Sequence, residues 1–490
     1  MSVKYIQKSE MNRQNDYAQS VRELLSEPTH YYIYTYGCQQ NDNDSEKLAG
    51  LLEQMGFLKA KRPEEADLVL LNTCSVRGNA DDRFYGNLGM VKAMRDHNPR
   101  MIVGVCGCMP EVEEHREKIQ RSYSFVDLMF GTSDIYRLPE LLFRRLSGSR
   151  RVYDIGTEDV IAEDLPVLHE RAYRALCTIM HGCNNFCSYC IVPYTRGRER
   201  SRKFELVLSE LRELAHQGFS EVMLLGQNVN AYGKDLPGDP RLHSFATLLR
   251  QAACTTGLRR IRFMTPHPKD VGDDLLDAMA EHANIEQHLH LPMQSGSDRI
   301  LGLMNRHYTA ERYMQIVRGA KERMPDISIT TDIIVGFPGE TEADFQQTLD
   351  LVEAVGFDSA FTFQYSPRYG TPAAEESGQI PQEVVTERFN RLLELQNQNS
   401  LNANLRRVGR TYEVLIEGLS DHNASQLTGR ASDNHLINFT VPPDLFDRFG
   451  LRADDYAALG DLLEGKFADV KIIEARTFSL KGEYMNLSDE

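Results

Sequence analysis

Short apolar runs alternate along the first third of the chain with longer stretches in which apolar residues recur every three or four positions. Leu68–Leu71 and Met101–Val105 are typical of buried strands, and Asp44–Met55 has helical spacing. Strands that alternate with helices predict an α/β domain with a mostly parallel sheet. We expect this domain over residues 29–148, after a polar N-terminal extension, 1–28, that is partly helical.

A second, longer alternation covers residues 171–405, after a polar stretch, 149–170, that lacks apolar periodicity and predicts a linker. Its six β/α units predict a partial TIM-like (βα)6 barrel, with chemistry at the carboxyl ends of the strands. The predicted strands are Ala175–Met180, Glu221–Leu225, Arg260–Met264, Gln287–Leu291, Ile327–Val335 and Ala360–Tyr365.

The last part of the chain, 406–482, has short β-rich runs and a helical insertion at 442–464. These runs predict a small all-β barrel of the kind that binds single-stranded or looped RNA. The alternative is an all-β accessory domain with another role. The final predicted strand is Thr477–Leu480.

Composition and charge narrow the class of protein. The 490 residues are 41% hydrophobic and 26% charged, as in soluble globular proteins. The polar N-terminus lacks the apolar core of a signal peptide, and runs such as Met101–Met109 are too short to span a bilayer. We therefore expect a cytoplasmic protein whose nine cysteines are ligands or core residues rather than disulfides.

The net charge of −16 argues against non-specific coating of nucleic acid but leaves room for a local basic groove. Basic residues gather at two places in the sequence. A solvated charged face is the alternative interpretation of each cluster. The predicted RNA-contacting residues are Arg196, Arg198, Arg200, Arg202, Arg406, Arg407 and Arg410.

Three cysteines follow the first barrel strand in the spacing C-x₃-C-x₂-C. Cys183, Cys187 and Cys190 can bind three irons of a cubane iron–sulfur cluster and leave the fourth iron open to a small molecule. Electron-transfer clusters normally have four cysteines, so this triad favours chemistry at the open iron. The alternative is a structural zinc site with His181 or Cys177 as fourth ligand.

Three more cysteines, Cys38, Cys74 and Cys108, each follow a predicted strand of the first domain. Because open parallel sheets bind ligands at the carboxyl ends of their strands, we expect these thiols to converge on a second cluster. Unrelated buried cysteines are the alternative. Cys106 would share a strand face with Cys108, and we favour Cys108 because Gly107 breaks the strand before it.

Neutral polar loops at the predicted strand ends suit a small bound molecule. A cubane with an open iron can chelate S-adenosylmethionine (SAM), and one electron then releases a 5′-deoxyadenosyl radical, while the protein holds the cofactor. For His267, His288 and His290 we favour a structural role, with a functional role as the alternative. The expected cofactor-binding residues are Tyr189, Gly226, Gln227, Asn228, Gln294 and Gly336.

The chain resembles the radical-SAM methylthiotransferases from about residue 30 to residue 482. The motifs that carry the resemblance are specific in both cysteine regions and in the barrel. They are Thr35–Asn41, Asn72–Arg77, Gly107–Met109, Pro193–Gly197 within Cys183–Arg202, and His290–Ser297.

This resemblance implies an N-terminal methylthiotransferase domain, a radical-SAM core and a C-terminal RNA-binding TRAM domain. It assigns Cys38, Cys74 and Cys108 to an auxiliary cluster, so that the cofactors are two [4Fe–4S] clusters and SAM. One SAM methylates sulfur carried at the auxiliary cluster, and a second provides the radical that removes hydrogen from carbon 2 of an adenine. The sulfur comes either from the cluster itself or from added sulfide.

Within the family, Pro193–Gly197, Gln294–Ser297 and Ser366–Arg368 resemble the branch that acts on N(6)-isopentenyladenosine beside the anticodon of tRNA. The alternatives are the branches that modify threonylcarbamoyl-adenosine in tRNA or an aspartate of a ribosomal protein. A non-catalytic iron–sulfur protein that binds RNA and senses redox state is an alternative of another class. The expected partners are the anticodon stem-loop and an electron donor such as flavodoxin or ferredoxin, with no membrane, and we expect a monomer.

The chain departs from the family pattern in three places. Pro110 stands where the family often has a small residue, Cys106 is an additional cysteine, and the insertion at 442–464 is longer than expected. No ligand is lost.

Overall fold

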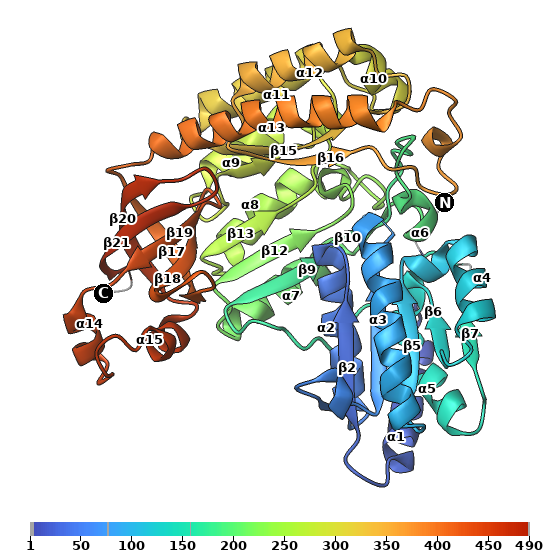
Figure 1. The fold of residues 1–490 in the computed structure, drawn as a ribbon. Coiled ribbons are helices and arrows are strands. Elements are labelled where there is room, and N and C mark those ends of the chain that lie inside the picture. Colours follow the sequence, from blue (N-terminus) through green and yellow to red (C-terminus); the bar gives the residue numbers. More distant parts are fainter. Residues whose placement is uncertain (1–3, 76–77, 157, 489–490) are drawn as a thin grey trace.

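The computed structural model describes residues 4–75, 78–156 and 158–488. Figure 1 shows three parts: an N-terminal α/β domain in blue and cyan, a central partial barrel in green to orange, and a small red β-barrel. The first two follow the predicted α/β class, and the third is all-β as expected. Among the described residues, no helix has the length and apolar character needed to cross a membrane.

A parallel sheet of six strands forms the N-terminal domain, in the order β3-β2-β4-β5-β6-β7. β4 and β5 are buried along their whole length because helices cover both faces of the sheet. The strands are β2 (His30–Thr35), β3 (Leu58–Lys59), β4 (Leu68–Thr73), β5 (Ile102–Gly107), β6 (Leu128–Phe130) and β7 (Val152–Asp154).

Helices form a layer on each face of this sheet. One core contains apolar residues of α1, α2 and α5, and the other contains residues of α3 and α4. The domain is therefore a three-layer α/β sandwich. The helices are α1 (Lys8–Leu24), α2 (Gln39–Gln54), α3 (Gly78–His97), α4 (Glu113–Ser122) and α5 (Leu138–Leu146).

The N-terminal segment and the predicted linker are more structured than the sequence indicated. Ala18 and Val21 give α1 an apolar stripe that packs against α5, so residues 8–24 are part of the domain rather than an extension. The short strand β1 (Lys4–Tyr5) pairs with β8 (Val160–Ile161), and β7 adds to the main sheet. Residues 149–170 thus contribute two strands.

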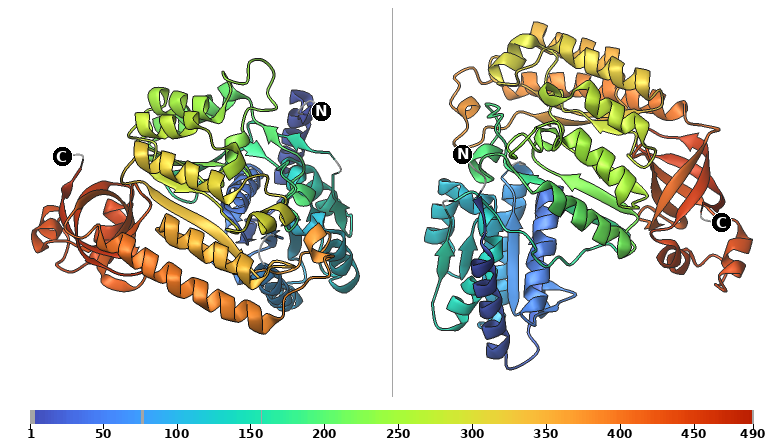
Figure 2. Two further views of the ribbon diagram at one scale, coloured as in Figure 1. Left: turned by 90° about the horizontal axis from the view of Figure 1, so that it is seen from above. Right: turned by 180° about the vertical axis from the view of Figure 1, so that it is seen from behind.

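The central domain has six parallel barrel strands, as predicted, in two three-stranded sheets ordered β13-β12-β9 and β14-β15-β16. A single bridge, Ile261 to Ile285, links the two sheets. Seen from above in Figure 2, the helices lie outside the strands. The strands are β9 (Arg174–Thr178), β12 (Glu221–Leu225), β13 (Arg260–Phe263), β14 (His288–His290), β15 (Ser328–Val335) and β16 (Ser359–Gln364).

The outer helices supply most of the apolar core of this domain. α12 begins at a capping box formed by Thr341 and Asp344 and ends at Gly356 in the left-handed conformation. The helices are α7 (Phe204–His216), α8 (Phe245–Thr255), α9 (Asp273–Glu281), α10 (Asp298–Leu303), α11 (Ala310–Arg323), α12 (Glu342–Val355) and α13 (Gln382–Leu405).

The C-terminal domain is a closed barrel in the order β17-β18-β19-β21-β20. The predicted insertion is helical, and α14 and α15 pack into the barrel core. The prediction for the last strand was wrong, because residues 476–479 form a turn in which Arg476 N donates to Ser479 O (2.9 Å). The elements are β17 (Thr411–Ser420), β18 (Asn423–Ala431), β19 (Leu436–Thr440), α14 (Pro443–Arg448), α15 (Tyr456–Leu463), β20 (Phe467–Ala475) and β21 (Leu480–Leu487).

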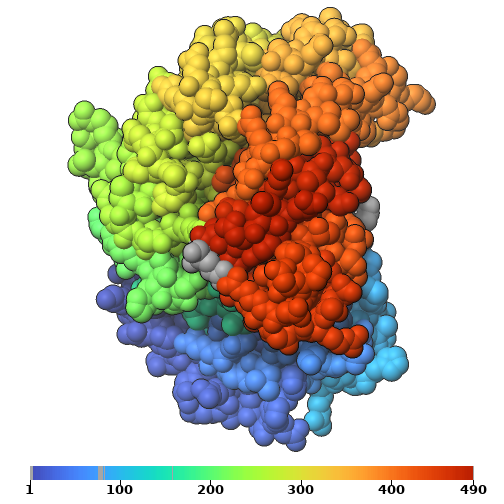
Figure 3. All heavy atoms as spheres, turned by 90° about the vertical axis from the view of Figure 1, so that its left-hand side faces the viewer, coloured from blue at the N-terminus to red at the C-terminus, as the bar shows by residue number. Residues whose placement is uncertain are grey.

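This barrel is docked at the amino ends of the central strands, opposite the cysteine loop. Arg260 donates to the carbonyl of Arg430 (2.8 Å), and Arg262 donates to that of Ala431 (3.2 Å). Both arginines are buried, and Arg262 also pairs with Glu221 (2.6 Å). Figure 3 shows the red barrel in close contact with the central domain.

Candidate active site

The three cysteines of the C-x₃-C-x₂-C motif lie on the loop between β10 (Met180–His181) and α6 (Val192–Thr195). Hydrogen bonds fold this loop on itself: Cys183 N donates to Gly197 O (3.1 Å), and Cys190 N donates to Cys187 O (2.9 Å). Burial raises the pKa of Cys183 and of Cys190 to about 12, and the neighbouring thiols add to the effect. Iron would reverse this preference, because coordinated thiols are deprotonated.

Arg306 is a neighbour of this triad that the sequence did not indicate. Its guanidinium is buried and donates to Cys187 Sγ (3.4 Å) and to Pro292 O (3.0 Å). It also lies 3.5 Å from the hydroxyl of Tyr189, the residue between two of the cysteines. Hydrogen bonds to the ligand sulfurs change the reduction potential of an iron–sulfur cluster, so Arg306 is placed to change the potential of a cluster bound here.

The proposed fourth ligands of a zinc site have other neighbours. Cys177 is fully buried and hydrogen-bonds to Glu210. His181 lies near Arg200 and Arg196, and burial lowers its pKa well below the usual value, with those charges adding to the effect. The strongest electrostatic neighbours of both residues therefore lie outside the triad.

The N-terminal cysteines come together at the carboxyl ends of β2, β4 and β5. Cys38 precedes α2, Cys74 follows β4, and Cys108 follows β5. At Gly37, whose φ is +116°, a Cβ would lie 2.7 Å from Cys74 Sγ, so only glycine fits beside that thiol. Within the motif Asn72–Arg77, Val76 and Arg77 lie outside the described residues.

Gly107 separates the two candidate cysteines of β5. Its φ of +92° breaks the alternation of the strand, and Cys106 lies in the apolar core with the residues of α2. Cys108 instead faces Cys38 and the Arg196 guanidinium. Burial raises the pKa of the Cys108 thiol, and Arg196 offsets this in part. The positions agree with the choice of Cys108.

Arg196 belongs to the central domain but reaches into the N-terminal domain. It lies after α6, and its Nη2 donates to Asp44 Oδ2 of α2 (2.8 Å) in addition to its contact with Cys108. Both charged side chains are about 5% exposed or less. This pair joins the segment that follows the radical-SAM triad to the helix that follows Cys38.

The arginine clusters divide into buried and exposed residues. Four of the predicted RNA contacts are largely buried and form ion pairs with carboxylates of the protein itself, which corrects the expectation that they face RNA. Those pairs are Arg196 with Asp44, Arg200 with Asp159, Arg202 with Glu163 and Glu210, and Arg407 with Asp358 and Asp433. Arg198, Arg406 and Arg410 are exposed, although Arg410 contacts Asp326.

The loop after β12 lies between the two α/β domains. Gly226 lies against Met180, and Gln227 donates to Gln40 of α2 (3.4 Å). The Asn228 amide is buried and donates to Glu199 (3.0 Å) and Asp270 (3.2 Å). Asn228 therefore fixes the loop. Its Oδ1 and Gln227 Oε1 are buried acceptors that receive no hydrogen bond from the part of the chain that the structure describes.

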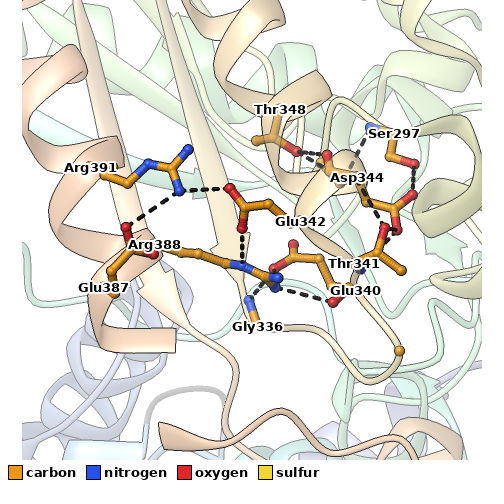
Figure 4. Close-up of polar contacts among 12 residues, drawn as sticks. Ser297, Gly336, Glu340, Thr341, Glu342, Asp344, Thr348, Glu387, Arg388 and Arg391 are labelled. Atoms are coloured by element: carbon orange, nitrogen blue, oxygen red, sulfur yellow. Dashed lines mark hydrogen bonds and ion pairs between the residues drawn. The ribbon is translucent and has the colours of Figure 1, made fainter. Parts of the chain in front are cut away.

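Gln294 and Gly336 lie at the carboxyl edge of the second sheet. Gln294 has a φ of +64°, and its backbone N donates to Asp332 O (2.8 Å). This hydrogen bond pairs Gln294 with the edge of β15. Gly336 N donates to Glu340 Oε2 (3.0 Å), and Glu340 pairs with Arg388 of α13 (3.0 Å). Figure 4 shows how this network holds the loop that follows β15.

His288 and His290 make hydrogen bonds within the barrel, whereas the buried Nε2 of His267 has no hydrogen-bond partner among the described residues. His288 and His290 both hydrogen-bond to the Thr330 hydroxyl, at 2.8 Å and 3.0 Å. His267 Nδ1 accepts a hydrogen bond from Lys269 N (3.2 Å) at the start of a 3₁₀ turn.

Comparisons with known proteins agree with this geometry. Residues 177–352 match the Radical SAM superfamily, residues 30–131 the Uncharacterized protein family UPF0004, and residues 405–485 the TRAM domain. The tRNA-2-methylthio-N(6)-dimethylallyladenosine synthase of Acetivibrio thermocellus is 47% identical over 98% of this chain and 97% of its own length. The synthase of the same name from Caldicellulosiruptor saccharolyticus is 48% identical over 92% of each chain.

A solved structure supports the fold. The radical S-adenosylmethionine methyltransferase TsrM of Kitasatospora setae, with cobalamin and a [4Fe-4S] cluster bound, aligns over 71% of this chain and 77% of its own. The TM-score is 0.51 at 16% identity, so the likeness concerns the fold alone.

Proposed function

Because the chain belongs to the family of tRNA-2-methylthio-N(6)-dimethylallyladenosine synthases, we propose that it adds a methylthio group to carbon 2 of N(6)-isopentenyladenosine (the dimethylallyl nucleoside) beside the anticodon of tRNA. It is a radical-SAM enzyme and a tRNA methylthiotransferase. The family implies a [4Fe–4S] cluster, SAM and a tRNA substrate.

The observation that carries the proposal is that two cysteine triads lie at strand ends of two domains that Arg196 joins. Three thiols follow the first barrel strand, three follow neighbouring strands of the N-terminal sheet, and Arg196 spans the boundary between them. Two jobs of the reaction, making a radical and supplying sulfur, need two centres close to one substrate atom. We therefore assign Cys38, Cys74 and Cys108 to an auxiliary [4Fe–4S] cluster.

The residues of both sites fit such clusters. Each triad offers three thiols in mostly buried surroundings with one arginine donor, Arg306 at Cys187 and Arg196 at Cys108, which suits an anionic cluster. A cluster bound by Cys183, Cys187 and Cys190 supplies an open iron for SAM and the electron that cleaves it.

The chain's own groups position the cofactor and keep water out. Gln294 has a side-chain amide beside β15 for hydrogen bonds to SAM, and Tyr189 closes the space next to the triad. Glu340 and Arg388 hold the loop that contains Gly336 in place. We propose that six residues form the surface that contacts SAM: Tyr189, Gly226, Gln227, Asn228, Gln294 and Gly336.

We also propose the tRNA contacts, the electron donor, the oligomeric state and the cellular location of the enzyme. Arg198, Arg406 and Arg410 are exposed cations that suit contacts with tRNA phosphates. We propose that the enzyme works in the cytoplasm as a monomer and receives electrons from a flavodoxin or a ferredoxin.

Anaerobic reconstitution tests the proposal. The protein should take up about eight irons per chain if both triads hold cubanes, and about four if only one does. Reduced enzyme with SAM should release 5′-deoxyadenosine and convert isopentenylated anticodon stem-loop RNA to the methylthio product. Iron-loaded enzyme that releases no 5′-deoxyadenosine would contradict the radical-SAM assignment.

A further inference from the structure

Two large aromatic side chains project from β16 on the side that the helices leave uncovered. Phe361 is 52% exposed and Phe363 is 39% exposed, although both lie in a strand of the barrel. Their intervening neighbour, Thr362, faces the opposite side, where α13 packs against β16. Together they form an apolar patch on one face of the strand, and such patches are common at ligand-binding grooves.

The register of the sheet shows that this surface is the inner face of the barrel. Phe361 pairs with Asp332 of β15, and Phe363 pairs with Ile334, so these four side chains share one face. Ile333, the residue between Asp332 and Ile334, instead faces the core formed with the outer helices. On the inner face, the Phe361 ring also meets His290 edge-on, with 5.9 Å between the ring centroids.

One apolar cluster links the strand beside this aromatic surface to the loop of the radical-SAM triad. Ile334, the partner of Phe363, packs against the same apolar cluster as Tyr189, which stands between Cys187 and Cys190. Gln294, the proposed SAM contact, is hydrogen-bonded to the backbone of β15 beside both phenylalanines. Phe361 lies two residues further from the triad than Phe363, which is about 6.6 Å along the strand.

We propose that Phe361 and Phe363 bind the apolar isopentenyl group of the target adenosine and make the enzyme select tRNA that already carries it. This inference rests on the proposed function. The isopentenyl group is a branched five-carbon chain without a polar atom, and an aromatic wall is the surface that such a group buries favourably. The rest of the substrate is polar, and the partly exposed Asp332, which lies 3.5 Å from His290, is beside the wall for hydrogen bonds.

Selectivity for the isopentenyl group tests the inference. Reconstituted enzyme is titrated with two anticodon stem-loop RNAs that differ only in whether the adenosine carries the isopentenyl group. The variants are Phe361→Ala, Phe363→Ala and the conservative Phe361→Leu, and Leu24→Ala serves as a matched control because it removes an exposed apolar side chain from α1. Release of 5′-deoxyadenosine is measured in parallel.

The wild type should bind the isopentenylated RNA more tightly than the unmodified RNA. Phe361→Ala and Phe363→Ala should each reduce that preference roughly tenfold, while the affinity for unmodified RNA and the rate of SAM cleavage stay unchanged. Phe361→Leu should keep most of the preference, and Leu24→Ala should keep all of it.

Three results would overturn the inference: a wild type without preference, an unchanged preference in both alanine variants, or loss of SAM cleavage in them. The last would place the phenylalanines at the cofactor. If the wild type binds both RNAs but forms no methylthio product, the proposed function fails instead.

Discussion

Arg196 of the radical-SAM core donates to Asp44 of the N-terminal domain across 2.8 Å, and both side chains are almost completely buried. Arg196 lies six residues after Cys190 in the sequence, and Asp44 lies six residues after Cys38. Arg196 also contacts Cys108. The pair therefore fixes the position of one triad relative to the other, which a reaction that uses both centres on one substrate requires.

Breaking this pair should destabilise the enzyme. Arg196→Met leaves the Asp44 carboxylate buried without its partner, which costs about 3–5 kcal/mol of the free energy of unfolding. Asp44→Asn in the same chain removes that charge and should recover a large part of the loss. Urea unfolding of the two single variants and the double variant measures the coupling, and strictly additive effects would show that the pair is not a unit.

Substitutions in the two triads should separate the two half-reactions. Cys187→Ala removes a ligand of the SAM site and should abolish both 5′-deoxyadenosine release and methylthio transfer. Cys74→Ala should keep 5′-deoxyadenosine release and stop transfer, because its triad lies in the other domain. Chromatography of the products from each variant measures both activities. Equal loss of both in Cys74→Ala would mean that the sites are not separable.

Exposed and buried arginines of the second basic cluster should behave differently. Arg406→Ala and Arg410→Ala should weaken tRNA binding several-fold and reduce the salt dependence of binding by about one phosphate contact each. Arg407→Ala should instead lower the free energy of unfolding, because Asp358 and Asp433 lose their buried partner. Binding titrations at several salt concentrations check this, with Arg62→Ala, an exposed arginine of the N-terminal domain, as control. Equal salt slopes in all the variants would argue against phosphate contacts by Arg406 and Arg410.

Glu111 should make stability depend on pH. Burial raises the pKa of its carboxyl from 4.5 to about 7, and Asp134 adds to the effect. Between these two values the unfolded chain gives up the proton first, so the free energy of unfolding falls as the pH rises from about 4.5 to about 7. Glu111→Gln keeps the acceptor for Thr132 N and should be more stable than wild type at pH 8, by about 1–2 kcal/mol, but not at pH 4.

Urea unfolding at pH 4, 6 and 8 measures this effect. Glu113→Gln is the control because Glu113 is exposed two positions away. A Glu111→Gln stability that follows the wild type at every pH would contradict the raised pKa.

The periodic parts of the fold could be predicted from the sequence. β12 has the predicted bounds, Glu221–Leu225, since a short apolar run is a local signal. The packing of residues 1–28 could not be predicted from local sequence signals. Whether α1 stays apart or packs depends on α5, which lies more than a hundred residues later in the chain.

The position of the cysteines of the site could also be predicted from the sequence, whereas the surroundings of its arginines could not. Cys108 could be chosen over Cys106 because a glycine between them permits a positive φ, which the structure has at Gly107. The spacing of Arg196, Arg200 and Arg202 resembles a basic groove, and nothing in it reveals their internal carboxylates such as Asp44. Arg306 and Phe361 carry no motif, and only the fold brings them to the triad and to the inner face.

Nucleoside mass spectrometry of tRNA tests the central claim most directly. A strain that lacks this protein should accumulate N(6)-isopentenyladenosine without its methylthio form, and the wild-type gene should restore the methylthio nucleoside while the Cys187→Ala and Cys74→Ala genes should not. An unchanged level of the methylthio nucleoside in the strain without the protein would contradict the account.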